Sequence, residues 1–179
     1  MRKKFSASSF WKECIQYNCT SFIYVGEICR FLVNQPPSDL DRQHKIRFCF
    51  GNGMRKNVWE DFNSRFGIKC AEFYGASEGN CTMVNFVSKV GACGFVPITN
   101  YVHKIMPICL IKIDEDMKPI RDKNGFCIEC KRGEKGLLVG FIGRSAQTQY
   151  SGYANNAEAT NSKVIKDVFR KGQNAFNSG

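Results

Sequence analysis

Long apolar runs are absent from this sequence of 179 residues, and only 5 prolines and 2 histidines occur in it. No apolar stretch approaches the roughly 20 residues that a membrane-spanning helix requires. The 16 glycines follow no period, which excludes a collagen-like or low-complexity chain. The basic start Arg2-Lys3-Lys4 is followed by Lys12 and Glu13 before an apolar segment develops, so we expect no secretory signal.

Acidic residues are in the minority, since 26 Lys and Arg stand against 16 Asp and Glu and give a net charge of +10. The basic residues are dispersed, and they form no stripe with interleaved aromatic residues of the kind that binds single-stranded nucleic acid. We therefore expect no nucleic-acid partner. The charge is typical of a solvated basic surface, and a weak affinity for anionic membranes is the alternative.

The 10 cysteines do not indicate a disulfide scaffold, because the chain is long enough to form a core without disulfides. Many of them stand inside apolar runs, where free cysteine behaves as a small buried hydrophobic residue. Cys127-Ile128-Glu129-Cys130 is a single C-x-x-C motif without a second pair or nearby histidines. Zinc or nucleic-acid binding would rest on Cys127, Cys130 and the net charge alone.

The first half of the sequence alternates helix and strand patterns. Ser6 or Ser8 is a candidate N-cap for a helix with Phe10, Cys14 and Tyr17 on its apolar face. This order of elements predicts part of a parallel sheet covered by helices, with ligands at the carboxyl ends of its strands. The further elements are a buried strand over 20–25, a helix over 27–34, a strand over 46–50, a helix over 59–66 that ends at Gly67, and a strand over 69–73.

The second half of the sequence has a different pattern, in which short apolar runs lie about ten residues apart. Strands are expected over 108–113, 126–128 and 137–139, with turns at 123–125 and 133–136. This pattern favours antiparallel strands in a barrel-like arrangement. The predicted fold class is thus α/β: part of a helix-covered, mostly parallel sheet in residues 1–94, followed by a smaller antiparallel β-barrel-like lobe in residues 95–179.

The segment that follows the strand over 69–73 contains the strongest candidates for ligand binding. Tyr74 offers a ring on which a nucleotide base can stack, and Gly75 lets the backbone approach a ligand closely. Ser77 can donate a hydrogen bond to a phosphate oxygen, and Glu78 can bind Mg²⁺, which prefers carboxylate oxygen. The alternative is an ordinary polar turn with an exposed glutamate.

Tyr74-Gly75-Ala76-Ser77-Glu78 resembles the Y-G-x-[ST]-E motif of adenylate-forming enzymes. The longer run from Glu72 to Cys81 is similar to the fatty acid transport proteins, also called very long-chain acyl-CoA synthetases. Further matches to that family lie at 3–8 with 10–11, at 26–32, at 51–53, at 90–95 and at 168–172.

The resemblance implies a reaction in which a long-chain fatty acid and ATP form acyl-AMP and pyrophosphate, after which CoA displaces AMP to give acyl-CoA. It also implies a membrane-associated parent protein, at the cytosolic face of the endoplasmic reticulum or plasma membrane, although this chain has no transmembrane segment. The implied cofactors are ATP, CoA and Mg²⁺. The implied site residues are Tyr74 on the adenine, Gly75 and Ala76 along the nucleotide, Ser77 at the α-phosphate, Glu78 on Mg²⁺, and Gly51, Asn52 and Gly53 flanking the adenine.

Other matching segments are expected to be structural. We interpret Gly133-Glu134 with 136–139, and also Gly152-Tyr153, as turns of the second lobe. The aromatic stretch 22–24 has two possible roles, as a border of the acyl tunnel or as ordinary core packing.

Several family features are missing from this sequence. No Gly-rich, Ser/Thr-rich phosphate loop ending in Lys occurs, and Gln173 stands where the family has Asp in Lys-Gly-Asp. The chain ends at 177–179, before the expected ribose-binding Asp and the C-terminal domain. We therefore expect an internal portion of a longer ligase that is inactive alone and exposes apolar sheet edges. The alternative is a non-catalytic fragment that binds nucleotide, acyl chain or membrane.

Overall fold

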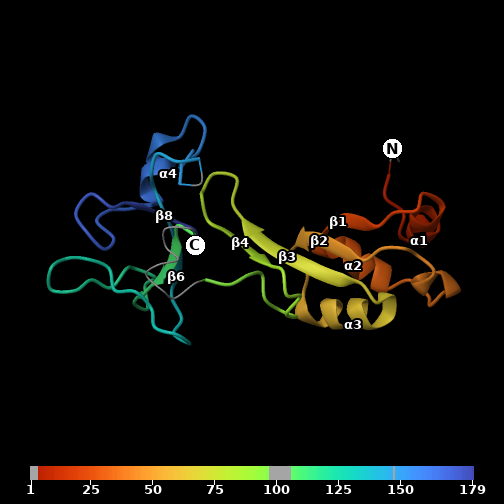
Figure 1. The fold of residues 1–179 in the computed structure, drawn as a ribbon. Helices are drawn as coiled ribbons and strands as arrows, with labels where there is room; N and C mark the ends of the chain where they lie inside the picture. Colours follow the sequence, from red (N-terminus) through yellow and green to blue (C-terminus); the bar gives the residue numbers. More distant parts are fainter. Residues whose placement is uncertain (1–3, 97–105, 147) are drawn as a thin grey trace. The chain divides into compact units, whose positions relative to one another are not determined.

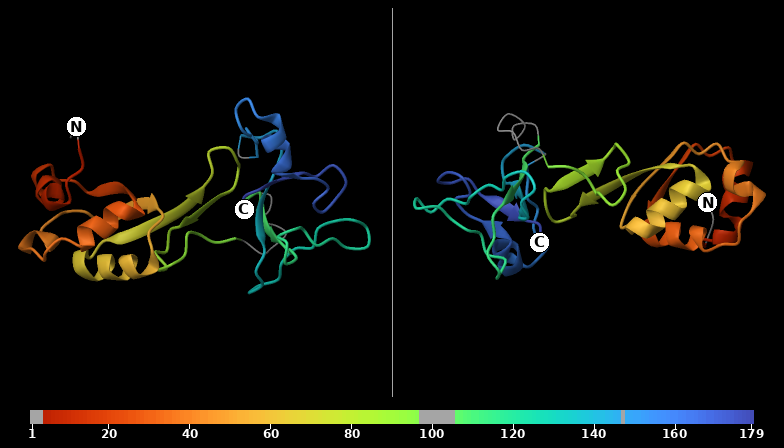
Figure 2. Two further views of the ribbon diagram at one scale, coloured as in Figure 1. Left: turned by 180° about the vertical axis from the view of Figure 1, so that it is seen from behind. Right: turned by 90° about the horizontal axis from the view of Figure 1, so that it is seen from below.

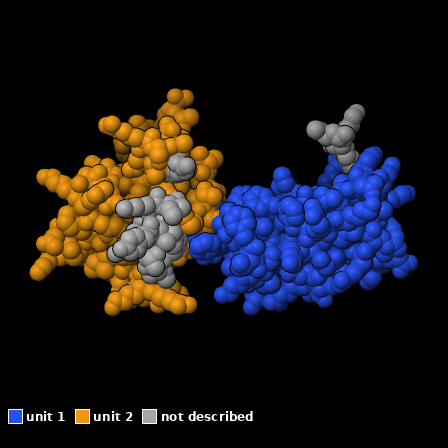
Figure 3. Space-filling view, in the orientation of Figure 1, with its two compact units in different colours: residues 1–74, 84–95 blue, residues 75–83, 96–179 orange. Residues whose placement is uncertain are grey.

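A computed structural model describes residues 4–96, 106–146 and 148–179 (Figure 1). The chain forms two compact units, of which the first comprises residues 1–74 and 84–95 and the second comprises residues 75–83 and 96–179 (Figure 3). The motif segment after Tyr74 therefore packs with the second unit. The basic run Arg2-Lys3-Lys4 lies largely outside the described residues.

The first sheet contains four strands in the order β1-β2-β3-β4. Strands β1, β2 and β3 are parallel, and Tyr24, Gly51 and Glu72 stand side by side in their register. This arrangement confirms the expected parallel sheet. The strand bounds are β1 (Ser21–Val25), β2 (Phe48–Asn52), β3 (Lys69–Gly75) and β4 (Thr82–Asn85).

Helices cover one face of this sheet. Helices α2 and α3 lie on the same side of the strands (Figures 1 and 2), and Trp59 and Phe62 of α3 are fully buried there. Gly67 ends α3 in the left-handed conformation with φ of 69°, as the sequence predicts. The helices are α1 (Ala7–Gln16), α2 (Gly26–Val33) and α3 (Lys56–Phe66), with the short 3₁₀ helix η1 (Asp39–Arg42).

Two expectations about buried faces are wrong. In α1 the buried residues are Trp11 and Cys14, whereas Tyr17 is the C-cap residue and is 71% exposed. Strand β1 is buried on one face only, because Ile23 and Val25 point away from the helices and are 81% and 56% exposed. Side chains alternate between the two faces of a strand, so Phe22 and Tyr24 face the helix-covered core while Ile23 and Val25 lie on the opposite face.

The second sheet is antiparallel, with the strand order β5-β6-β8-β7. Its core includes Cys109, Val139 and Val168. Among the described residues the sheet is open, with β5 and β7 at its two ends, so the barrel-like expectation holds for the antiparallel pairing but not for closure. The elements are β5 (Ile108–Ile111), β6 (Leu137–Phe141), α4 (Ala157–Ser162), β7 (Val164–Ile165) and β8 (Ala175–Asn177).

The strand expected over 126–128 is not a strand. Cys127 forms an isolated bridge with Arg121, and Glu129 forms one with Ile111. The Lys123-Asn124-Gly125 turn is present, with Gly125 at φ of 83°. Within the described part of the chain, no helix combines the length and the hydropathy needed to cross a membrane.

Candidate functional site

The motif loop begins where strand β3 ends. Tyr74 and Gly75 are the last residues of β3, and the loop then runs through Ala76, Ser77 and Glu78 before β4 begins. Ser77 is exposed and the Glu78 side chain is partly exposed. The candidate ligand-binding side chains of this loop are therefore accessible rather than buried in the core.

Two hydroxyl groups hold the Glu78 carboxylate. Ser77 Oγ donates to Glu78 Oε2 at 3.1 Å, and Tyr153 Oη donates to Oε1 at 3.2 Å. The pKa of Glu78 is lowered, chiefly because its own backbone N–H favours the charged form and next because of the Ser77 hydroxyl. The carboxylate is thus ionised and oriented before any cation reaches it.

Tyr153 is itself held in place by the segment that contains it. Its backbone N–H donates to Thr160 Oγ1 at 2.9 Å, and the preceding Gly152 N–H donates to the Glu78 carbonyl at 3.1 Å. The Gly152-Tyr153 pair therefore contacts both the backbone and the side chain of Glu78. The sequence predicts a turn at this pair, and Gly152 has the positive φ of a turn, but no local pattern indicates the contact with Glu78.

The end of the motif loop is also anchored within the second unit. The amide of Asn80 donates to the carbonyls of Phe141 at 2.8 Å and Thr148 at 3.0 Å. Gly79 lies against the ring of Phe176, so that a Cβ at position 79 would be 2.1 Å from a ring carbon. These contacts leave the backbone around Glu78 little freedom.

The glycine segment Gly51-Asn52-Gly53 lies at the carboxyl end of β2. Gly51 and Asn52 are the last residues of the strand, and Gly53 follows with φ of 77°. Because β2 and β3 are parallel neighbours, this segment and Tyr74 lie at the same edge of the first sheet. Gly51 is buried, Asn52 is half-buried and Gly53 is exposed.

A buried carboxylate lies beside this segment. Glu72 of β3 is 5% exposed, and its oxygens accept from Tyr24 Oη at 2.5 Å and from the backbone N–H of Met54 at 3.0 Å. Burial and the Glu72 carboxylate raise the pKa of Tyr24. Of the aromatic stretch 22–24, Phe22 and Tyr24 face the helix-covered core, which agrees with the packing alternative.

Comparison with known proteins identifies the family. Residues 1–132 match the AMP-binding enzyme family. The chain belongs to this family. Over 182 aligned residues it is 48% identical to long-chain fatty acid transport protein 1 of Mus musculus and 43% identical to long-chain fatty acid transport protein 3 of Homo sapiens. These alignments cover the whole of this AMP-binding chain but only 28% and 26% of the two relatives.

Solved structures agree on the fold of the AMP-binding chain. ATP-bound MatB from Rhodopseudomonas palustris aligns with a TM-score of 0.66 at 16% identity, over 100% of this chain and 31% of that one. The N-terminal domain of FACL13 from Mycobacterium tuberculosis aligns with a TM-score of 0.63 at 17% identity, over 99% of this chain and 39% of that one. The α/β fold class expected from the sequence is therefore confirmed.

The cysteines of this AMP-binding chain are all free, and eight of them are buried. Cys130 Sγ points at the Lys135 carbonyl, 3.5 Å away. Among the residues that the structure describes, no group of three or more His, Cys, Asp or Glu side chains is placed to hold a metal ion. Cys127 packs in the hydrophobic core of the second unit, and Cys130 is also buried.

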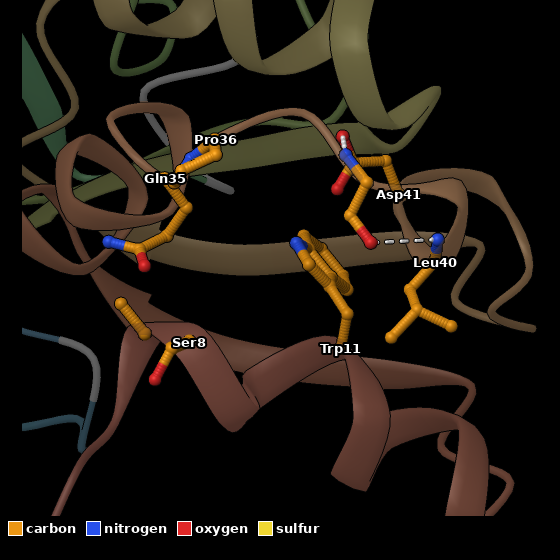
Figure 4. Close-up of a pocket in the computed structure, with 8 residues that line it drawn as sticks. Ser8, Trp11, Gln35, Pro36, Leu40 and Asp41 are labelled. Carbon is orange, nitrogen blue, oxygen red and sulfur yellow. Dashed lines mark hydrogen bonds between the residues drawn. The ribbon is translucent and has the colours of Figure 1, made fainter.

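A separate pocket of about 150 Å³ lies between α1 and the segment 35–41 (Figure 4). Its lining contains none of the candidate nucleotide-binding residues. Trp11 Nε1 and Asp41 Oδ1 lack a hydrogen-bond partner among the described residues, but both atoms are shielded from solvent.

Proposed function

We propose that this AMP-binding chain is a portion of an ATP-dependent long-chain or very long-chain fatty acid–CoA ligase. In that reaction the fatty acid carboxylate attacks the α-phosphate of ATP, acyl-AMP forms and pyrophosphate leaves. CoA then displaces AMP through its thiol and gives the acyl-CoA thioester. The observation that carries the proposal is the Tyr74–Glu78 motif at the end of β3, with an accessible and oriented Glu78.

The nucleotide would lie along the carboxyl edge of the parallel strands, as ligands do in open α/β sheets. Tyr74 would stack on the adenine and Gly75 with Ala76 would line the nucleotide. The segment 51–53, at the end of the neighbouring strand β2, would flank the base. Ser77 would donate to the α-phosphate, and its exposed hydroxyl suits that role.

Glu78 fits a single ligand of Mg²⁺. Each of its oxygens accepts one hydroxyl and keeps a further lone pair, and Mg²⁺ in nucleotide sites needs one or two carboxylates together with phosphate oxygens. When bound, Mg²⁺ neutralises negative charge on the phosphates. With nucleotide bound, the single hydroxyl proton of Ser77 would turn from Glu78 to the α-phosphate, and Tyr153 would keep the carboxylate oriented.

Further partners follow from the same proposal. The relatives are named long-chain fatty acid transport proteins, so the acid is a long-chain fatty acid, with CoA as the thiol substrate. The net charge of +10 supports a role at an anionic membrane surface, on the cytosolic face of the endoplasmic reticulum or plasma membrane.

The test is ATP–pyrophosphate exchange with oleate as the acid. We expect no exchange from residues 1–179 alone and measurable exchange from a chain extended at both ends. In the extended chain, Glu78→Gln should abolish most of the exchange, whereas Glu115→Gln, the same change at an exposed turn residue, should leave it intact. Unchanged exchange in Glu78→Gln would remove Glu78 from the metal role.

A further inference from the structure

Glu72 is a buried carboxylate that the proposed chemistry does not use. Burying a carboxylate is unfavourable unless hydrogen bonds compensate for the lost water. Here Glu72 Oε2 accepts from Tyr24 Oη, and Oε1 accepts from the Met54 N–H. The two donors come from strand β1 and from the residue directly after Gly53, so a single side chain of β3 joins both neighbouring segments.

Strand register explains how Tyr24 reaches Glu72. Tyr24, Gly51 and Glu72 occupy the same level on three adjacent strands, so Gly51 stands between the two side chains. Adjacent strands are about 4.8 Å apart, so the tyrosine must cross the middle strand to reach β3. A Cβ on Gly51 would lie 2.6 Å from Tyr24 Cδ2, so the ring passes directly over this glycine.

The backbone after Gly51 is held from two sides. On one side Glu72 binds the Met54 N–H. On the other side Gly26, the first residue of α2, lies against the Gly53 carbonyl, and a Cβ at position 26 would be 1.9 Å from that oxygen. The path of Asn52 and Gly53 is thereby determined by contacts from β3 and α2.

We infer that Glu72 and Tyr24 are positioning residues that lock the Asn52-Gly53 segment at the edge of the sheet where the base would bind. Gly51 serves this lock by leaving space for the Tyr24 ring. The role toward the base rests on the proposed function, whereas the lock itself is a property of residues 1–179.

Two variants of similar size separate hydrogen bonding from packing. Glu72→Gln keeps an oxygen for the Met54 N–H and offers an amide N–H to the Tyr24 oxygen, whereas Glu72→Leu offers neither. In the 179-residue chain we expect amide hydrogen exchange at Met54 to be about five- to tenfold faster in Glu72→Leu and close to the unsubstituted rate in Glu72→Gln. Tyr24→Phe, which keeps the ring over Gly51, should give an intermediate increase.

The amide of Gly67 is the internal reference, because its bond to the Asn63 carbonyl lies in the same unit, at the end of α3. If the exchange rate at Met54 rises no more than the rate at Gly67, the substitution destabilises the whole unit. The inferred lock would then be wrong. Equal effects of Glu72→Gln and Glu72→Leu would also overturn it, because packing alone would then explain the change.

The role toward the base is tested by ATP affinity in the chain extended at both ends. We expect Glu72→Leu to weaken binding several-fold and Glu72→Gln to restore it. If the unsubstituted protein binds ATP and Glu72→Leu binds it equally well, the positioning role is wrong although the proposed function stands. If the unsubstituted protein binds no ATP, the proposed function fails and the role toward the base fails with it, while the exchange data still decide the lock.

Discussion

At the residue scale, glycines mark the places where this chain leaves no space for a side chain. Gly79 is the clearest case in the motif loop, because the Phe176 ring occupies the position where a Cβ would be. Phe176 is 2% exposed and its ring packs against Tyr150, with ring centroids 5.1 Å apart. The ring therefore cannot move away without disturbing its other neighbour.

We expect Gly79→Ala to lower the free energy of unfolding of the second unit by about 1–3 kcal/mol, the usual cost of overpacking a core. Urea denaturation followed by Tyr fluorescence would measure the change. In Phe176→Leu, which makes room beside position 79, the added Gly79→Ala should cost clearly less. Additive costs would contradict the contact.

A second prediction at the residue scale concerns Asp122 and the pH dependence of the turn that it stabilises. The backbone N–H groups of Phe126 and Asn124 donate to its carboxylate at 3.0 and 2.8 Å, and the pKa of Asp122 is lowered, chiefly by Phe126. Because the pKa of Asp122 is lower in the folded chain, its charged form stabilises the turn at pH values above 3.8, the ordinary pKa of an aspartate. This stabilisation is lost as the pH falls through the folded-state pKa.

The measurement is a carboxyl NMR titration of Asp122 together with the amide shift of Phe126. Both should titrate together at a pH below 3.8. Asp122→Asn retains an oxygen acceptor, so its turn should persist while the pH dependence at the Phe126 amide disappears. A midpoint at the ordinary Asp value would be the contrary result.

At the element scale, α3 is one of the helices that cover the first sheet. It buries Val58, Trp59, Phe62 and Phe66, which recur at helical spacing, and Gly67 ends it. Phe62 packs against Phe22 and Phe66, with ring centroids 6.3 and 4.8 Å away. The helix is therefore held by aromatic packing as well as by its own backbone bonds.

We expect Phe62→Ala to reduce the free energy of unfolding of the first unit by about 3–5 kcal/mol, because a large buried side chain is replaced by a cavity. Glu60→Ala, on the exposed side of the same helix, should change it by no more than about 0.5 kcal/mol. Urea denaturation monitored by Trp fluorescence compares the two. Similar effects at both positions would contradict the assigned face.

At the scale of the whole molecule, the first sheet leaves apolar side chains on its uncovered face. Ile23, Val25 and Phe48 are 81%, 56% and 45% exposed. An exposed apolar face on an edge strand promotes association between chains. This exposed apolar surface predicts poor solubility of the 179-residue chain.

We expect Ile23→Thr together with Val25→Thr to raise the soluble concentration of the 179-residue chain and to reduce its binding of a hydrophobic dye. Threonine keeps the strand preference of β1 while removing apolar surface. Tyr17→Thr, at an exposed aromatic residue outside the sheet, is the matched control and should have a much smaller effect. An equal gain from Tyr17→Thr would show that any exposed apolar residue suffices.

Much of this fold was determined by local features of the sequence. The helical spacing of Trp59, Phe62 and Phe66 and the glycine after them predicted α3 and its end. The motif at Tyr74–Glu78, directly after a predicted strand, indicated the candidate site at the end of β3. The prediction of α3 succeeds because periodicity and turn residues act over a few residues, whereas the roles of the motif residues stay predictions.

Tertiary structure decided the rest, since it depends on contacts between distant residues. Helical spacing predicts Tyr17 on the buried face of α1, but Trp11 is buried instead, because local spacing does not reveal which neighbour will cover the helix. Tyr153 meets Glu78 across 75 residues, and Tyr24 meets Glu72 across 48. Strand register and unit packing bring these groups together, and no local pattern encodes either one.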